Sequence, residues 1–183
     1  MNTARRASAG NGTNTAALAS GGNLGPPNAY ADFVESWNGT NWTEVNDLNS
    51  GRNGLRGIGS NTAALVFGGY TGSFSSLTEQ WNGTNWTEVN DLLGGARSYP
   101  GAAGASSSSG LAFGGNNGAG TKTESWNGSI WTNENTMSTD RFAFGSAGTQ
   151  TAALAGAGNT SPGAYIATTE EWFGSGTLSE NID

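Results

Sequence analysis

The side chains that could carry acid–base chemistry in this chain are carboxylates, because the sequence contains no histidine and no cysteine. Without those residues, zinc and copper lose their usual ligands, and the commonest general base and the thiolate nucleophile are absent. A paired-carboxylate hydrolase is the remaining enzymatic interpretation, with Glu44 and Asp47 or Glu88 and Asp91 as its acids. These acids recur at one place in a repeated segment, which is typical of structural residues. We therefore expect no enzyme, no cofactor and no metal site, with calcium left open because its ligands are oxygens.

The acids lie in a segment that the chain repeats. The sequence ESWNGTNWTEVNDL at residues 35–48 returns as EQWNGTNWTEVNDL at residues 79–92. An arginine, an apolar run ending in glycine and a Glu-x-Trp recur in that order four times. The arginines are Arg6, Arg52, Arg97 and Arg141, the glutamates are Glu35, Glu79, Glu124 and Glu170, and the tryptophans are Trp37, Trp81, Trp126 and Trp172. These landmarks predict one domain over residues 1–183 with four units, at about 2–48, 49–92, 93–137 and 138–183.

The pattern inside each unit is typical of strands, since short apolar runs end in glycine pairs and no window has the spacing of a surface helix. Four strands are expected in each unit. In the second unit they are predicted at Leu55–Ser60, Thr62–Gly68, Leu77–Asn82 and Asn85–Asn90.

The Asn-Gly between the two tryptophans of a unit predicts a tight hairpin with a type I′ turn. Centring this turn on Gly39 and Thr40 places Trp37 opposite Trp42 and Glu35 opposite Glu44. The same pairing joins Trp81 to Trp86 and Trp126 to Trp131. In the last unit, Thr177 stands where the others have the second tryptophan.

A four-stranded meander repeated about every 45 residues is typical of a β-propeller blade. The Gly-Gly after an apolar strand, the Glu-x-aromatic, the later Trp and the Arg that opens the next unit resemble the kelch repeat, over all four units. The chain departs from that family in having Trp-Asn-Gly in place of Tyr-Asp-Pro, and fewer blades than is usual. Its Trp-Asn-Gly units are similar to kelch-like segments of bacteriophage virion and tail-fibre proteins. The resemblance implies an all-β propeller of four kelch-like blades.

The innermost strands of a small ring converge steeply, so they need small side chains. The candidates ASAGNG, LRGIGS, PGAAGA and FGSAGT are dominated by Gly, Ala and Ser. This pattern, together with a whole number of units, predicts a small closed ring. The alternative is an open array that pairs with other copies into a larger ring, as a homo-oligomer.

The repeated residues have two interpretations, a binding surface or a structural core. Paired tryptophans could stack on sugar rings, and a ring of arginines could bind anions. Burial of aromatic area and pairing of a buried guanidinium favour the structural interpretation. We assign structural roles to Trp37, Trp42, Trp81, Trp86, Trp126, Trp131, Trp172, Arg6, Arg52, Arg97, Arg141, Glu35, Glu79, Glu124 and Glu170.

The segments between the glycines and the Glu-x-Trp differ among the four units, although the rest repeats. Diversified loops on a rigid scaffold commonly form binding sites, and Tyr, Asn and Ser suit carbohydrate. The candidate ligand-binding residues are Asn23, Asn28, Tyr30, Tyr70, Phe74, Asn116, Asn117, Lys122, Asn159 and Tyr165. Unconstrained drift of the loops is the alternative explanation.

The missing catalytic residues and the diversified loops predict a non-enzymatic binding module. The resemblance implies a phage virion or tail as its setting, with a host-surface glycan or another virion protein as the partner. A cytoplasmic kelch-type protein-interaction domain and a purely structural virion subunit are the alternatives. The net charge of −7 and the absence of a basic patch argue against nucleic acid as a partner. No apolar run is long enough to span a membrane or to form a signal peptide. We therefore expect the protein to belong to a virion that is assembled inside a cell and is extracellular after release.

Overall fold

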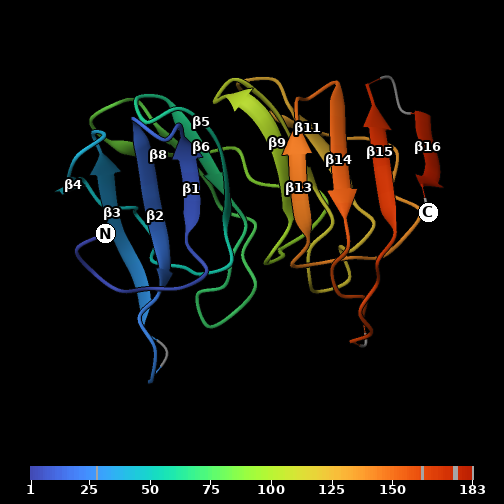
Figure 1. Ribbon diagram of the computed structural model, residues 1–183, viewed down its shortest axis with the longest axis horizontal. Helices are drawn as coiled ribbons and strands as arrows, with labels where there is room; N and C mark the ends of the chain where they lie inside the picture. The colour runs from blue at the N-terminus through green and yellow to red at the C-terminus, as the bar shows by residue number, and fades with distance from the viewer. Residues whose placement is uncertain (28, 162, 175–176, 183) are drawn as a thin grey trace.

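The computed structural model describes residues 1–183 except 28, 162, 175–176 and 183, and it gives only the backbone at 177–182. Within the described chain every regular element is a β-strand. The strands form four antiparallel sheets of four strands each, which confirms the all-β prediction. In each sheet the strands lie in chain order, so each sheet is a meander built from one continuous segment (Figure 1).

The first sheet contains β1 (Ala9–Gly12), β2 (Ala17–Asn23), β3 (Tyr30–Trp37) and β4 (Trp42–Val45). The second contains β5 (Arg56–Gly59), β6 (Ala64–Phe67), β7 (Thr78–Trp81) and β8 (Trp86–Val89), each inside its predicted range. The third contains β9 (Gly101–Ser106), β10 (Ser109–Phe113), β11 (Thr123–Trp126) and β12 (Trp131–Asn133). The fourth contains β13 (Gly145–Gly148), β14 (Ala152–Gly156), β15 (Thr169–Phe173) and β16 (Thr177–Ile182).

The four sheets meet through their first strands. Strand β1 lies against β5, β5 against β9, and β9 against β13. Small residues permit this approach: a Cβ added at Gly57 would lie 2.4 Å from Asn11 Oδ1, and one at Gly101 would lie 2.6 Å from the Phe144 ring. The arrangement is compatible with propeller-like stacking of the sheets.

The series of first strands does not close on itself. Among the described residues no comparable contact joins β13 back to β1. Figure 1 places the first and fourth sheets at opposite ends of the long axis, with β4 and β16 outermost. The chain start does not bridge the ends either, because Asn2 N–H donates to Glu35 Oε1 in the first sheet. The small closed ring is thus a prediction that the strand contacts do not support. Small inner residues let neighbouring strands approach, but this approach does not by itself close a ring.

The apolar core consists of three clusters, one in each gap between neighbouring sheets. Between the first and second sheets Leu18 and Leu48 pack with Trp81 and Trp86. The gap between the second and third sheets contains Leu65, Leu92, Trp126 and Trp131. The third gap holds Leu111, Met137 and Trp172. Each of the first three sheets therefore contributes a leucine to the gap that follows it, and each of the last three contributes tryptophan to the gap that precedes it.

The predicted register of the outer hairpin is confirmed in three sheets. Trp37 pairs with Trp42 and Glu35 with Glu44, and the corresponding tryptophans pair in the second and third sheets. In the fourth sheet the backbone register differs: Leu178 lies opposite Trp172, and Thr177 lies opposite Phe173. The register thus corrects the assignment of Thr177 to the place of the second tryptophan.

The hairpin turn is not of type I′. Gly39 has φ +92°, but Asn38 and Thr40 do not have positive φ. Instead the side chain of Asn38 accepts hydrogen bonds from Thr40 N–H and Asn41 N–H, each at 2.9 Å. The turn is a longer loop closed by an asparagine side chain, which leaves only the glycine in the left-handed region.

Candidate binding site

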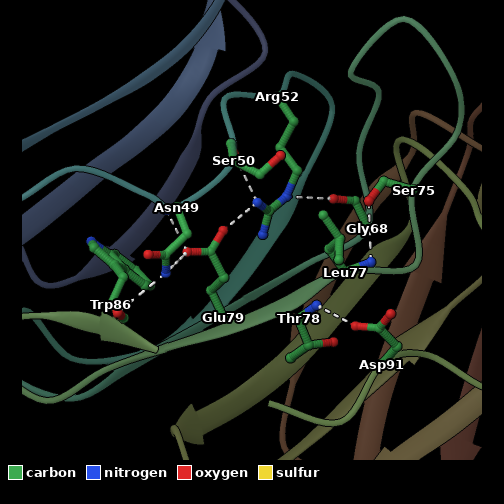
Figure 2. A network of polar contacts seen from close by, with 10 residues as sticks. All are labelled: Asn49, Ser50, Arg52, Gly68, Ser75, Leu77, Thr78, Glu79, Trp86 and Asp91. Carbon is green, nitrogen blue, oxygen red and sulfur yellow. Dashed lines mark hydrogen bonds and ion pairs between the residues drawn. The ribbon is translucent and has the colours of Figure 1, made fainter. Parts of the chain in front are cut away.

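Three of the repeated arginines lie in the interior, each paired with a repeated glutamate: Arg52, Arg97 and Arg141. Figure 2 shows the pair of the second sheet, in which Arg52 contacts Glu79 and also donates to Gly68 O at 3.0 Å. Glu79 Oε2 in turn accepts from the backbone and the side chain of Asn49, both at 2.8 Å. Arg97 pairs with Glu124 at 2.7 Å in the third sheet. With their side chains buried, these groups are not accessible to a ligand.

The first unit corrects the sequence assignment of its arginine. Arg5, not Arg6, lies 3.0 Å from Glu35 and is the counterpart of Arg52. Arg6 is instead the counterpart of Asn53, and it exchanges backbone hydrogen bonds of 3.1 and 2.8 Å with Asn23. Its side chain is left exposed.

Short backbone bridges hold the bases of the variable loops. The bond pair between Arg6 and Asn23 has its counterpart between Asn53 and Tyr70, and Asn116 N–H donates to Ser98 O at 2.8 Å. Each bridge joins the residue after a buried arginine to the residue after a glycine pair. The fourth unit has the same bridge between Phe142 and Asn159, with bonds of 2.9 and 3.0 Å, so all four units present equivalent backbone positions.

The bridges in neighbouring units are joined through residues with left-handed backbone. Ala7, Gly54, Tyr99 and Ala143 occupy one repeat position and have φ between +52° and +63°. Tyr99 N–H donates to Gly54 O at 2.6 Å, and Gly54 N–H donates to Ala7 O at 2.9 Å. A non-glycine residue in this region costs free energy, so Tyr99 stays there because this ladder holds it.

A depression of about 310 Å³ lies over these bridges, and we call it the loop-face depression. Its lining residues come from the first three units: Arg6, Asn23, Tyr30, Asn53, Tyr70, Phe74, Ser98, Tyr99 and Asn116. The rings of Tyr30 and Tyr70 meet edge to face at 5.7 Å between centroids, and Tyr70 meets Phe74 in the same way at 5.3 Å. The three rings are half-buried, so each keeps surface for a ligand.

The charge at the depression is positive. Arg6 is exposed there, and no ion pair joins it to a carboxylate in the described part of the chain. Arg56 lies near Tyr99, and burial lowers the pKa of its guanidinium, although its electrostatic interaction with Tyr99 acts in the opposite direction. The site thus offers rings, amides and a cation.

The structure brings together half of the residues predicted from the loops. Asn23, Tyr30, Tyr70, Phe74 and Asn116 line the loop-face depression. The other described candidates, Asn117, Lys122, Asn159 and Tyr165, do not line it, and Asn28 lies outside the described residues.

Four lining residues were not predicted to bind: Arg6, Asn53, Ser98 and Tyr99. A sequence signal existed for two of them, because Asn53 and Ser98 each follow a repeated arginine.

The acids considered for a paired-carboxylate hydrolase either accept structural hydrogen bonds or are exposed to solvent. Asp91 accepts from Thr78 N–H at 3.1 Å (Figure 2). It also accepts from the Ser76 hydroxyl at 3.3 Å. Glu44 and Asp47 are exposed. No group of three or more potential ligand side chains able to hold a metal ion occurs among the residues described. The described part of the chain also contains no helix that is long and apolar enough to cross a membrane.

Comparison of the chain with protein-family models and with curated proteins found no match.

Proposed function

We propose that this chain is a non-enzymatic, kelch-like propeller module that binds a glycan in the loop-face depression. The observation that carries the proposal is the convergence of Tyr30, Tyr70 and Phe74 with asparagine side chains in one concave surface. Rigid aromatic groups with a few polar groups around them are typical of ligand sites, and about 310 Å³ is within the usual range of pocket volumes.

Carbohydrate suits this surface for chemical reasons. A sugar ring has an apolar face of C–H groups, which stacks on an aromatic ring, and a rim of hydroxyls, which exchange hydrogen bonds with amides. Asn53 and Asn116 line the same depression as the rings and have amide groups that can donate and accept hydrogen bonds. The exposed guanidinium of Arg6 adds a donor that favours an acidic sugar over a neutral one.

The proposed setting is a phage particle or tail, with the module extracellular after release. This part rests on the resemblance of the Trp-Asn-Gly units to phage virion proteins. Antibody labelling of purified particles from a producing culture would test it, and a protein confined to the host cytoplasm would contradict it.

A glycan array tests the binding proposal. We expect the wild-type chain to bind at least one bacterial or algal polysaccharide, and Tyr70→Ala to lose that signal. Tyr165→Ala is the matched control, because Tyr165 is 88% exposed and lies outside the depression. Binding that survives Tyr70→Ala would contradict the proposed site. Absence of any polysaccharide hit would contradict the glycan proposal and favour a protein partner.

A further inference from the structure

Each gap between neighbouring sheets is built from the same parts. One repeat position supplies a leucine that reaches toward the following sheet: Leu18, Leu65 and Leu111 are buried in the first, second and third gaps. The opposing sheet supplies its tryptophan, at Trp81, Trp126 and Trp172 in the same order. The chain therefore contains three versions of a single interface.

The backbone bonds across the gaps repeat as well. Gly22 N–H donates to Arg52 O at 2.9 Å, and the same bond joins Gly69 to Arg97 at 2.8 Å. The third joins Gly115 to Arg141 at 2.9 Å. Among the described residues no fourth bond of this kind occurs. Gly158 is the counterpart of the three donors and Arg5 is the counterpart of the three acceptors, and the two are not bonded to each other.

The fourth sheet leaves its outer half of the interface uncovered. Leu154, the counterpart of Leu18, is 41% exposed, and Phe173 beside it is 45% exposed. A depression of about 270 Å³ lies between them, lined also by Ala152 and Trp172. Leu154 occupies the position that is fully buried in the three preceding sheets.

The first sheet leaves the complementary half uncovered. Trp37 and Trp42 pack against each other, with ring centroids 5.5 Å apart, and they are only half-buried. Their counterparts Trp81 and Trp86 are buried against the sheet that precedes them. Among the described residues no sheet packs in that place against the first sheet.

We infer that the uncovered face of the fourth sheet binds the first sheet of a second copy of this chain. Leu154 then packs on Trp37 and Trp42 of the second copy, as Leu18 packs on Trp81 and Trp86. Gly158 N–H donates to the carbonyl of Arg5 of the second copy. The partner is a second copy because one chain carries both halves of an interface that it already forms three times internally. The inference does not depend on the proposed glycan function.

Symmetry selects the size of the assembly. A head-to-tail contact of this kind gives a closed ring if the rotation closes and an open fibre if it does not. Two copies joined at both ends make a two-fold ring of eight sheets, at the upper end of the usual propeller range of about four to eight blades. Three copies would exceed that range.

Size-exclusion chromatography with light scattering on the 183-residue chain tests the inference. We expect twice the mass of one chain at about 1 to 100 µM, a range typical of specific association. Leu154→Arg replaces an apolar side chain of the contact by a longer, charged one and should weaken dimerisation by about 100-fold or more. Leu93→Arg is the matched control, because Leu93 is 61% exposed and lies in the connection between the second and third sheets.

Mixing variants separates this contact from a symmetric one. Trp42→Arg should also give a monomer, because it damages the other half of the interface. A mixture of Trp42→Arg and Leu154→Arg chains retains one undamaged pair of faces and should regain two-chain species. Melting curves of each variant report whether it is folded.

A wild-type monomer at 100 µM, a dimer unaffected by Leu154→Arg, and variants that do not associate on mixing would each contradict the contact. A mass that increases without limit as the concentration is raised would contradict the closed ring of eight sheets.

Discussion

Arg5 Nη2 lies 3.0 Å from Glu35 Oε2, which places the first unit in the same frame as the third, where Arg97 contacts Glu124 at 2.7 Å. A buried arginine and a buried glutamate therefore form an ion pair in every unit. Because Arg5 takes the carboxylate, the neighbouring Arg6 is left to line the loop-face depression. Two adjacent arginines thus have different roles: Arg5 is structural, and Arg6 is a candidate for ligand binding.

The first prediction concerns the buried pair of the second sheet. Arg52→Met should lower the free energy of unfolding by about 3–5 kcal/mol, because it leaves Glu79 buried without its counter-charge. The double variant Arg52→Met/Glu79→Leu should recover much of that loss. Denaturant unfolding measures both, and Arg6→Met, an exposed arginine, is the control with an expected change within about 0.5 kcal/mol. A loss of similar size for Arg6→Met would contradict the structural assignment.

The second prediction concerns stability at low pH. Burial alone raises the pKa of the Glu170 carboxyl, but hydrogen bonds from Ser138 and the contact with Arg141 outweigh it, and the pKa is lowered in the folded protein. A lowered folded pKa stabilises the fold above the unfolded value, about 4.3 for glutamate. That contribution is lost as the pH falls through the folded pKa.

The difference in unfolding free energy between the wild type and Glu170→Gln should therefore narrow below about pH 4.3. Denaturant titrations between neutral pH and pH 3 measure it. A constant difference over that range would show that the charge of Glu170 does not contribute.

The third prediction compares two tryptophans at equivalent places in different hairpins. Trp131 is buried between the second and third sheets, and its Nε1 donates to the Thr78 hydroxyl at 3.1 Å. Trp131→Ala should cost about 3–5 kcal/mol of unfolding free energy. Trp42→Ala should cost about half as much in the monomer, because Trp42 is half-buried. The comparison needs dilute protein, since a second copy would bury Trp42.

The fourth prediction concerns the hairpin turn of the second sheet. The side chain of Asn82 accepts from Thr84 N–H and Asn85 N–H, each at 2.9 Å. Asn82→Ala should lower the unfolding free energy by about 1 kcal/mol, whereas Asn82→Asp keeps the acceptor and should cost less. Equal losses for the two variants would indicate that the side-chain hydrogen bonds do not stabilise the turn.

The sequence predicted local structure well because strand, turn and repeat signals are local. The strands of the second unit and the pairing of Trp81 with Trp86 follow from alternation and the position of Asn-Gly. Closure of the ring could not be predicted in the same way, because it depends on how side chains from separate units pack across each gap. The turn type was wrong because Asn82 acts through its side chain rather than through its backbone.

The candidate site was predicted in part for the same reason. Tyr30, Tyr70 and Phe74 belong to loops that fail to repeat, and that difference is visible in the sequence. Ser98 and Tyr99 reach the loop-face depression through the contact between neighbouring units, which no single unit reveals. The sequence assigned the ion pair with Glu35 to Arg6 and not to Arg5. The two arginines are adjacent, and the spacing of the repeat does not show which of them occupies the paired position.

The fifth prediction concerns the charge of the ligand and rests on the proposed glycan function. Arg6 is exposed in the loop-face depression without a carboxylate partner in the described chain, so it can donate to an acidic sugar. Arg6→Gln should weaken binding of an acidic oligosaccharide by about tenfold, the usual value of a charge-assisted hydrogen bond, and leave a neutral one nearly unchanged. Titration calorimetry with a matched acidic and neutral pair measures both. Increased salt should weaken only the acidic ligand, because screening acts on the charge of the guanidinium. An equal loss for the neutral sugar would mean that Arg6 shapes the surface rather than recognising charge.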